Sequence, residues 1–88
     1  EKRPQAHVAI GASYLLSGRS QEAHRQFVRA LEIDSENPEA HINIALLDMQ
    51  GGHLHKAIDR LHKVLQRHPS PQAQRLLEEA YRQKTNDQ

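Results

Sequence analysis

The stretch PEAHINIALLDMQGGHLHKAIDRLHKVLQRHP, residues 38–69, decides the fold of this chain. Apolar residues recur along it every three or four positions, which is the spacing of an amphipathic helix. Pro38 suits the first turn of a helix, where a missing amide hydrogen costs nothing. Gly51 and Gly52 interrupt the pattern, and glycine accepts the left-handed conformation that ends many helices. The stretch therefore predicts two helices joined by a tight turn.

A nearly matching copy of this hairpin lies 34 residues earlier, over residues 4–35. A fixed period of this length, with a turn in its middle, is typical of helical arrays. The small and apolar residues match best, and these residues determine how closely helices approach each other. The identical pairs at this offset are Pro4 and Pro38, Ala6 and Ala40, His7 and His41, Ile10 and Ile44, Gly18 and Gly52, Ala23 and Ala57, and Leu31 and Leu65.

The same signals predict five helices in the whole chain, over residues 4–17, 20–34, 38–50, 54–68 and 72–84. We expect Ser20 and Asn37 to cap the second and third helices, because their short polar side chains accept hydrogen bonds from free amides. The last helix has one apolar stripe and a charged remainder, which is typical of a terminal capping helix. The prediction is one all-α domain over residues 1–88, with repeats at about 4–37 and 38–71 and a capping helix at about 72–84.

Composition narrows the class of protein. The chain has 88 residues, enough for one small domain with a thin core. Its net charge is +1 with both signs interspersed, so no basic run indicates nucleic-acid binding. The absence of cysteine excludes disulfides and thiolate metal sites. No apolar stretch resembles a signal peptide or a membrane span, so we expect no direct membrane insertion.

The sequence does not distinguish a cytoplasmic from a periplasmic location, since proteins of both compartments can lack cysteine. The chain starts Glu-Lys-Arg-Pro without Met, and we expect it to be part of a longer protein. Nothing in the sequence resembles a nucleophile elbow or a glycine-rich phosphate loop. Two helical hairpins also offer no deep pocket that would exclude water. We therefore predict that the chain is not an enzyme.

The repeat resembles the tetratricopeptide repeat, a family of 34-residue helix–turn–helix units. The resemblance covers two repeats and a final helix. The positions that match the family pattern are Ile10, Gly11, Tyr14, Ala23, Phe27 and Ala30 in the first copy, and Ile44, Ala45, Ala57, Leu61 and Pro69 in the second. The departures are His7 and His41 in place of a large hydrophobic residue, Asp48 in place of Tyr, Ser35 in place of Pro, and Val64 in place of Ala.

This resemblance implies a right-handed superhelix, an α-solenoid of antiparallel helix pairs, whose concave face is lined by the first helix of each repeat. Members of the family hold peptides or helices of partner proteins on that face. The capping helix would close its far side with Arg75 or Glu79. The groove residues implied in this chain are Gln5, Val8, Ala9, Ala12, Leu15, Glu39, Ile42, Asn43, Leu46 and Met49.

The implied groove is mostly apolar. Some members of the family grip carboxylates with a clamp of Lys, Asn and Arg, and only Asn43 lies at a clamp-like position here. A carboxylate against Val8 would lose its hydration without gaining a partner. We therefore expect a partner that offers an amphipathic helix or an extended apolar segment. The alternative is a structural module, in which the same apolar surface joins copies of the chain or packs on other parts of a longer protein.

The seven histidines raise two further hypotheses. His55, Asp59 and His62 are spaced i, i+4 and i+7, so they could reach one Zn²⁺ or Ni²⁺ ion. The competing interpretation is a solvated helix face, which we favour, and we predict no cofactor. His7 and His41 recur at one repeat position, which predicts a shared packing role for a half-buried neutral ring. A pH-sensitive stack is the functional alternative for this pair.

Overall fold

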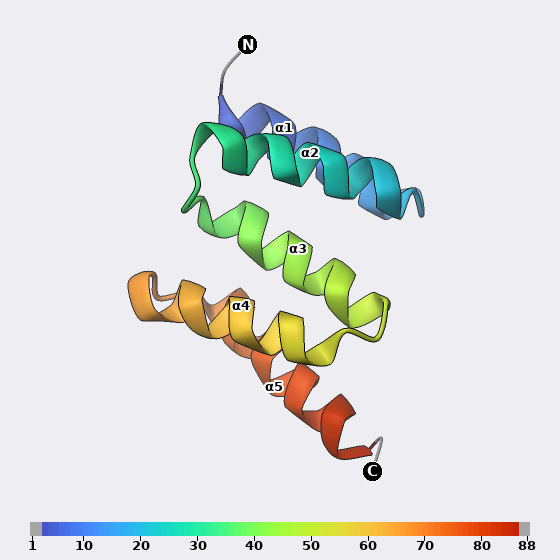
Figure 1. Cartoon of the computed structure of the whole chain (residues 1–88), viewed down its shortest axis with the longest axis vertical. Coiled ribbons are helices and arrows are strands. Elements are labelled where there is room, and N and C mark those ends of the chain that lie inside the picture. The colour runs from blue at the N-terminus through green and yellow to red at the C-terminus, as the bar shows by residue number, and fades with distance from the viewer. Residues whose placement is uncertain (1–2, 87–88) are drawn as a thin grey trace.

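The structure is a computed structural model that describes residues 3–86. Within these residues the chain forms five helices and no strand, so the predicted all-α fold is confirmed. The first four helices end within one residue of the predicted positions, and the fifth extends further in both directions. The helices are α1 (Pro4–Leu16), α2 (Ser20–Ile33), α3 (Pro38–Gln50), α4 (Leu54–Arg67) and α5 (Pro71–Asn86), as Figure 1 shows.

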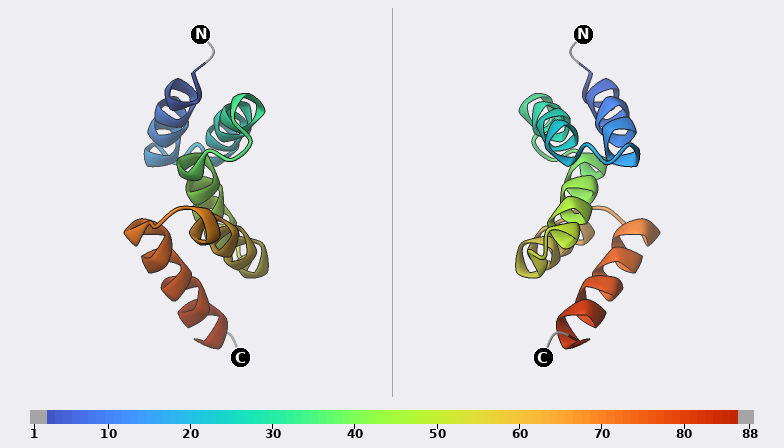
Figure 2. Two further views of the ribbon diagram at one scale, coloured as in Figure 1. Left: turned by 90° about the vertical axis from the view of Figure 1, so that its left-hand side faces the viewer. Right: turned by 90° about the vertical axis from the view of Figure 1, so that its right-hand side faces the viewer.

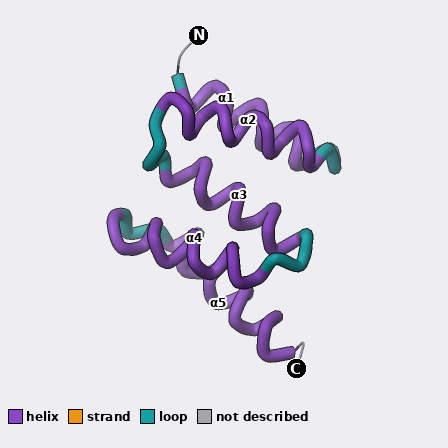
Figure 3. Tube along the Cα trace, in the orientation of Figure 1, coloured by secondary structure: helices purple, strands orange, loops and turns teal. Residues whose placement is uncertain are grey.

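The helices stack as hairpins along the longest dimension of a body measuring 44 × 29 × 18 Å. Helices α1 and α2 form one hairpin, α3 and α4 form the next, and α5 packs mainly against α4. The connecting loops are short and alternate between the two sides of the stack (Figure 3). In the side views, α1 and α5 lie on one side of the stack with α3 set back between them (Figure 2). The predicted helical-hairpin solenoid is confirmed.

The helix starts follow from proline and from short polar side chains. Pro4, Pro38 and Pro71 each stand in the first turn of a helix, where their missing amide hydrogen leaves no bond unmade. Asn37 caps α3 as predicted, because its Oδ1 accepts a hydrogen bond from the amide of Ala40 at 2.9 Å. The prediction for Ser20 is wrong by one position.

Ser20 is the first residue inside α2, and Arg19 occupies the capping position without a side-chain bond. A serine at the cap and a serine one residue later look alike in sequence, because both precede the same apolar stripe. An unpredicted cap stands before α5, where the Ser70 hydroxyl accepts a hydrogen bond from the amide of Ala73 at 3.1 Å.

The turns inside both hairpins depend on a glycine in the left-handed region. Gly18 has φ 78° and Gly52 has φ 82°, and no other residue between 3 and 86 has a positive φ. The left-handed conformation costs other residues about 1 kcal/mol or more, because their Cβ approaches the following carbonyl oxygen. The turn therefore recurs at the same repeat position for a steric reason.

The core consists of two clusters that meet at α3. The first joins the α1–α2 hairpin to one side of α3 and comprises Val8, Ala23, Phe27, Ala30, Ala40 and Ile44. The second joins the other side of α3 to α4 and α5, and comprises Ile42, Ala45, Met49, Ala57, Ile58, Leu61, Val64, Ala73, Leu77 and Ala80. The many buried alanines let the helix backbones approach each other closely.

Gly11 shows how tight that packing is. A Cβ atom at this position would lie 2.5 Å from Cε1 of Phe27 and 2.9 Å from its Cδ1. Phe27 is fully buried, so its ring fills the space that any side chain at position 11 would need. The glycine of the family pattern is thus explained in this chain by contact with the aromatic ring of the same hairpin.

Candidate protein-interaction surface

The predicted groove residues lie on α1 and α3, but they divide into two groups. Val8, Ile42 and Met49 are buried in the core clusters, so they are core residues of this chain. Leu15 is half-buried and packs against the first cluster. These four side chains contact the chain's own helices, and our expectation that they line an open groove needs correction. Both helices are apolar on more than one side, so apolar character alone did not indicate which side faces the core.

The remaining predicted residues form a stripe at the helical spacing i, i+4 and i+7. On α1 the stripe passes through Gln5, Ala9 and Ala12. On α3 it passes through the equivalent residues of the second repeat, Glu39, Asn43 and Leu46. Gln5, Ala9 and Glu39 are exposed, and Ala12, Asn43 and Leu46 are half-buried. We call these six residues, together with Leu16 and Gln50 at the i+11 positions, the α1–α3 stripe.

Leu16 is the residue that sequence reasoning missed. Its side chain is 91% exposed, and it continues the line of Gln5, Ala9 and Ala12 by one more turn. Its counterpart Gln50 is also exposed. Strict application of the i+11 spacing would have found both residues, since Leu15 and Met49 lie about 100° around the helix from them.

Leu46 is the second apolar residue available on this stripe. It is half-buried, yet it packs against neither core cluster. Glu39 is the charged residue of the stripe, and Gln5, Asn43 and Gln50 add polar groups without charge. The surface therefore offers apolar contacts at Leu16 and Leu46 and hydrogen-bonding groups between them.

On α5, the two residues expected to close the far side differ in availability. Arg75 is exposed. Glu79 is half-buried and accepts hydrogen bonds from Arg82 and from Gln83 on its own helix. Arg75 is therefore the freer of the two side chains for contact with another molecule.

The histidine and carboxylate candidates for a metal site do not come together. Asp59 forms an ion pair with Lys63 at 3.3 Å, and Nε2 of His62 lies 2.9 Å from the hydroxyl of Tyr81 on α5. His55 is exposed on α4. Among residues 3–86, no group of three histidine or acidic side chains is close enough to hold one ion.

Comparison with known families assigns the architecture. The family model described as tetratricopeptide repeat matches residues 14–86. The chain belongs to the tetratricopeptide repeat family. Tetratricopeptide repeats are generally protein–protein interaction modules and typically non-enzymatic scaffolds, so the coarse predictions of a binding scaffold with protein partners are confirmed. A search of curated proteins finds no match to the chain.

In this tetratricopeptide domain, the repeated histidines have equivalent partners. Nδ1 of His7 lies 2.9 Å from Oε1 of Gln26, and Nδ1 of His41 lies 2.8 Å from the guanidinium of Arg60. Both partners are 19 residues further along, on the second helix of the same repeat. Both rings are half-buried, so the predicted shared packing role agrees with this geometry.

The two rings differ in where they carry hydrogen. Arginine can only donate, so Nδ1 of His41 accepts, and Nε2 carries the proton that it donates to the Ser35 carbonyl at 2.9 Å. The amide oxygen of Gln26 accepts, so Nδ1 of His7 is the donor there. Each ring therefore ties the first helix of its repeat to the second by a polar contact, where the family usually has a hydrophobic one.

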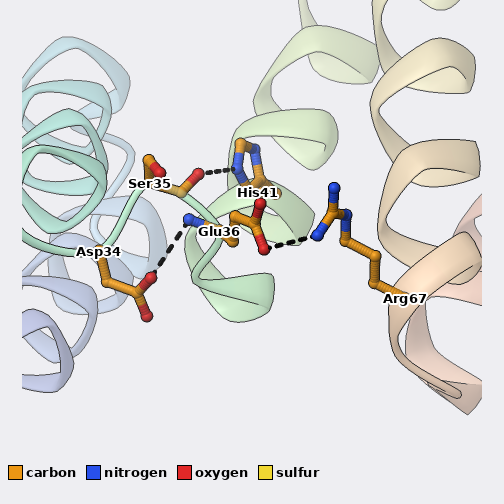
Figure 4. Close-up of polar contacts among 5 residues, drawn as sticks. All are labelled: Asp34, Ser35, Glu36, His41 and Arg67. Carbon is orange, nitrogen blue, oxygen red and sulfur yellow. Dashed lines mark hydrogen bonds and ion pairs between the residues drawn. The ribbon is translucent and has the colours of Figure 1, made fainter.

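A separate hollow of about 720 Å³ opens beside α4, away from the α1–α3 stripe. Basic side chains dominate its lining, and four of them follow one side of α4: Lys56, Arg60, Lys63 and Arg67. Arg67 crosses its edge to Glu36 at 2.9 Å, as Figure 4 shows. Because Glu36 and Asp59 already pair with two of these cations, the excess positive charge is small.

Between residues 3 and 86, no helix has both the length and the apolar character that crossing a bilayer requires.

Proposed function

We propose that this tetratricopeptide domain binds a helix or an extended apolar segment of a partner protein on the α1–α3 stripe. The observation that supports this proposal best is the pair of leucines on the stripe, with Leu16 on α1 91% exposed and Leu46 on α3 half-buried. Burying one leucine side chain contributes roughly 1.5–3 kcal/mol, so two leucines supply a useful part of a binding energy.

The polar residues of the stripe favour an amphipathic guest. Gln5, Asn43 and Gln50 can donate and accept hydrogen bonds at the edges of an apolar contact. Glu39 disfavours a guest whose nearest group is a carboxylate, since like charges in contact repel. The family clamp for carboxylates would also need a basic residue where this chain has Val8, which is buried, and an asparagine where it has Ala12. The expected guest is therefore a helix with leucine-like anchors and a polar or basic rim.

A peptide selection tests this proposal. Peptides that bind the wild-type chain are selected from a library of amphipathic helices, and their dissociation constants are measured against variants. Leu16→Gln and Leu46→Ala are suitable, because each introduces the residue that the other repeat carries at that position. We expect each variant to weaken binding about tenfold, as removal of most of a leucine contact should.

The control variant is Val28→Ala on α2, which removes an exposed apolar side chain outside the stripe. Its binding should match the wild type. Binding that survives the double variant Leu16→Gln/Leu46→Ala would place the site elsewhere. If the unmodified chain instead forms a dimer in light scattering, and the double variant dissolves it without any peptide, the stripe is an assembly surface and the partner proposal is wrong.

A further inference from the structure

One side of α4 carries a row of four cations that the first repeat lacks. They stand at i, i+4, i+7 and i+11, a spacing that places them on one side of the helix over about 16 Å. The four residues are Lys56, Arg60, Lys63 and Arg67. The equivalent residues of α2 are Glu22, Gln26, Arg29 and Ile33. The first hairpin forms without such a row, so the packing of a hairpin does not require it.

The row lines the hollow of about 720 Å³ beside α4. This volume is in the range of about 300–1,000 Å³ that is typical of ligand-binding pockets. The rest of its wall includes Glu36 on the connection between α2 and α3, and His41 on α3. The lining is polar or charged apart from Val64, so the hollow suits a charged guest better than an apolar one.

Two carboxylates of the chain itself already pair with half of the row. Oε1 of Glu36 lies 2.9 Å from Nη1 of Arg67 (Figure 4), and Oδ2 of Asp59 lies 3.3 Å from Nζ of Lys63. All four side chains of these two pairs are more than half exposed. The row therefore receives carboxylates from its surroundings, and it does so at the end of α4 nearest Arg67.

The other half of the row has cationic groups to spare. Lys56 is exposed, and no ion pair within residues 3–86 includes it. Arg60 has five N–H donors, and its bond to Nδ1 of His41 at 2.8 Å uses one of them. Oδ2 of Asp48 lies 4.0 Å from Nε of Arg60, beyond hydrogen-bond distance, and Asp48 is not part of the hollow. Two positive charges of the hollow thus have no carboxylate bonded to them among the described residues.

We propose that this hollow binds an acidic segment of a partner protein, through two carboxylates about 6 Å apart that reach Lys56 and Arg60. Glutamates at i and i+4 of a helix have this spacing, because the helix rises 1.5 Å per residue. Hydrogen bonds between a carboxylate and a cationic donor are stronger than those between neutral groups. The site is separate from the α1–α3 stripe and does not depend on the function proposed for that stripe.

A nucleic acid is a poorer occupant of the same hollow. Proteins that hold single strands combine a cationic groove with aromatic side chains on which the bases stack. No Phe, Tyr or Trp lines this hollow, and only two of its cations lack a carboxylate. Glu36 and Asp59 would also repel the further phosphates of a strand. A short acidic segment matches the available charge more closely.

The test uses an alanine-based peptide of about 16 residues, long enough to form a helix, with glutamate at two central positions i and i+4. The peptide is titrated into the isotopically labelled chain near neutral pH and low salt, and amide shifts are followed by nuclear magnetic resonance. We expect the shifts to concentrate on α4 and on residues 34–37. A twin peptide with glutamine in place of both glutamates should bind at least about tenfold more weakly, and salt should weaken the acidic peptide.

Three variants of the chain locate the site. Lys56→Glu, which introduces the residue of the first repeat, should weaken the acidic peptide at least about fivefold. Arg29→Glu makes a similar change of charge on an exposed residue of α2 outside the hollow, and it should have a much smaller effect. Glu36→Gln frees Arg67 and should tighten binding about twofold, an increase that mere loss of structure would not produce.

The proposal is overturned if the acidic peptide causes no shifts at millimolar concentration, or if its glutamine twin binds equally well. Equal losses in Lys56→Glu and Arg29→Glu also overturn it, because the net charge of the chain would then explain the binding. A single-stranded oligonucleotide that binds the hollow more tightly than the peptide at the same salt overturns our choice of occupant. So does a dimer of the free chain that Lys56→Glu dissolves.

Discussion

Gly11 provides a quantitative test of the packing between α1 and α2. In a helix interior, replacing glycine with alanine normally stabilises a protein by about 1 kcal/mol, since alanine loses less backbone entropy on folding. Here a Cβ atom would lie 2.5 Å from Cε1 of the fully buried Phe27. Overpacking of a core costs about 1–3 kcal/mol, and so short a distance belongs at the upper end. We therefore expect Gly11→Ala to lower the free energy of unfolding by about 1–2 kcal/mol.

The second repeat indicates which change should compensate. At the equivalent positions it has Ala45 and Leu61, both fully buried in one cluster. Leucine lacks the distal ring atoms that would meet a Cβ at position 11. Phe27→Leu alone should lose about 1 kcal/mol by leaving a small cavity. In the double variant the new methyl group occupies part of that cavity, so the two changes should couple favourably by about 1–3 kcal/mol.

Urea unfolding followed by far-ultraviolet circular dichroism measures these differences, since the free energy of unfolding falls linearly with denaturant. In thermal unfolding, 1 kcal/mol corresponds to about 4–8 °C in a domain of this size. Ser13→Ala, on the exposed side of α1, is the matched control. It should stabilise the chain by about 0.5 kcal/mol at most, because alanine has a higher helix propensity than serine. If Gly11→Ala stabilises the chain, or if the two changes in the double variant simply add, the close contact with Phe27 is wrong.

Four further substitutions test a helix cap, a turn and the surface, each by urea unfolding. Asn37→Ala should lower the free energy of unfolding by about 1 kcal/mol, because the Ala40 amide loses its hydrogen-bond acceptor. An unchanged stability would show that this cap does not stabilise the chain. Gly52→Ala should lower the free energy of unfolding by about 1 kcal/mol, because Gly52 has a positive φ. Gly51→Ala should be nearly neutral, because Gly51 has φ −86°. Equal effects of the two changes would contradict the turn geometry. Glu36→Gln breaks the exposed ion pair with Arg67 and should change the free energy of unfolding by less than about 1 kcal/mol, with a smaller difference in high salt. A larger loss that does not depend on salt would contradict the weak contribution expected of this ion pair.

Much of the fold was predictable because its signals are local. Proline and glycine marked the ends of the helices, and the 34-residue offset revealed the repeat. The second helices α2 and α4 each have a single apolar stripe, so the inward positions of Ala23, Phe27 and Ala57 followed from periodicity. The burial of these residues confirms those expectations.

The candidate surface was less predictable, because α1 and α3 are apolar on several sides. Such helices give almost no directional signal, so periodicity could not tell the core side from the open side. Val8, Ile42 and Met49 were expected outside and lie inside, whereas the exposed Leu16 was missed. The neighbouring helices determine which apolar side is covered, and the sequence of one helix does not contain that information. Ile10 and Ile44 are the same residue at equivalent positions, yet they are 46% and 3% exposed, which makes the same point.

Helix α3 has a mechanical consequence for the whole molecule. It contributes Ala40 and Ile44 to one cluster and Ile42, Ala45 and Met49 to the other, while α1 and α2 do not pack on α4 or α5. A rotation or a shift of this one helix would therefore change the orientation of the α1–α2 hairpin relative to α4 and α5. A partner segment bound along Asn43 and Leu46 would restrict the motion of α3. The angle between the α1–α2 hairpin and the α4–α5 pair would then differ between the bound and the free chain.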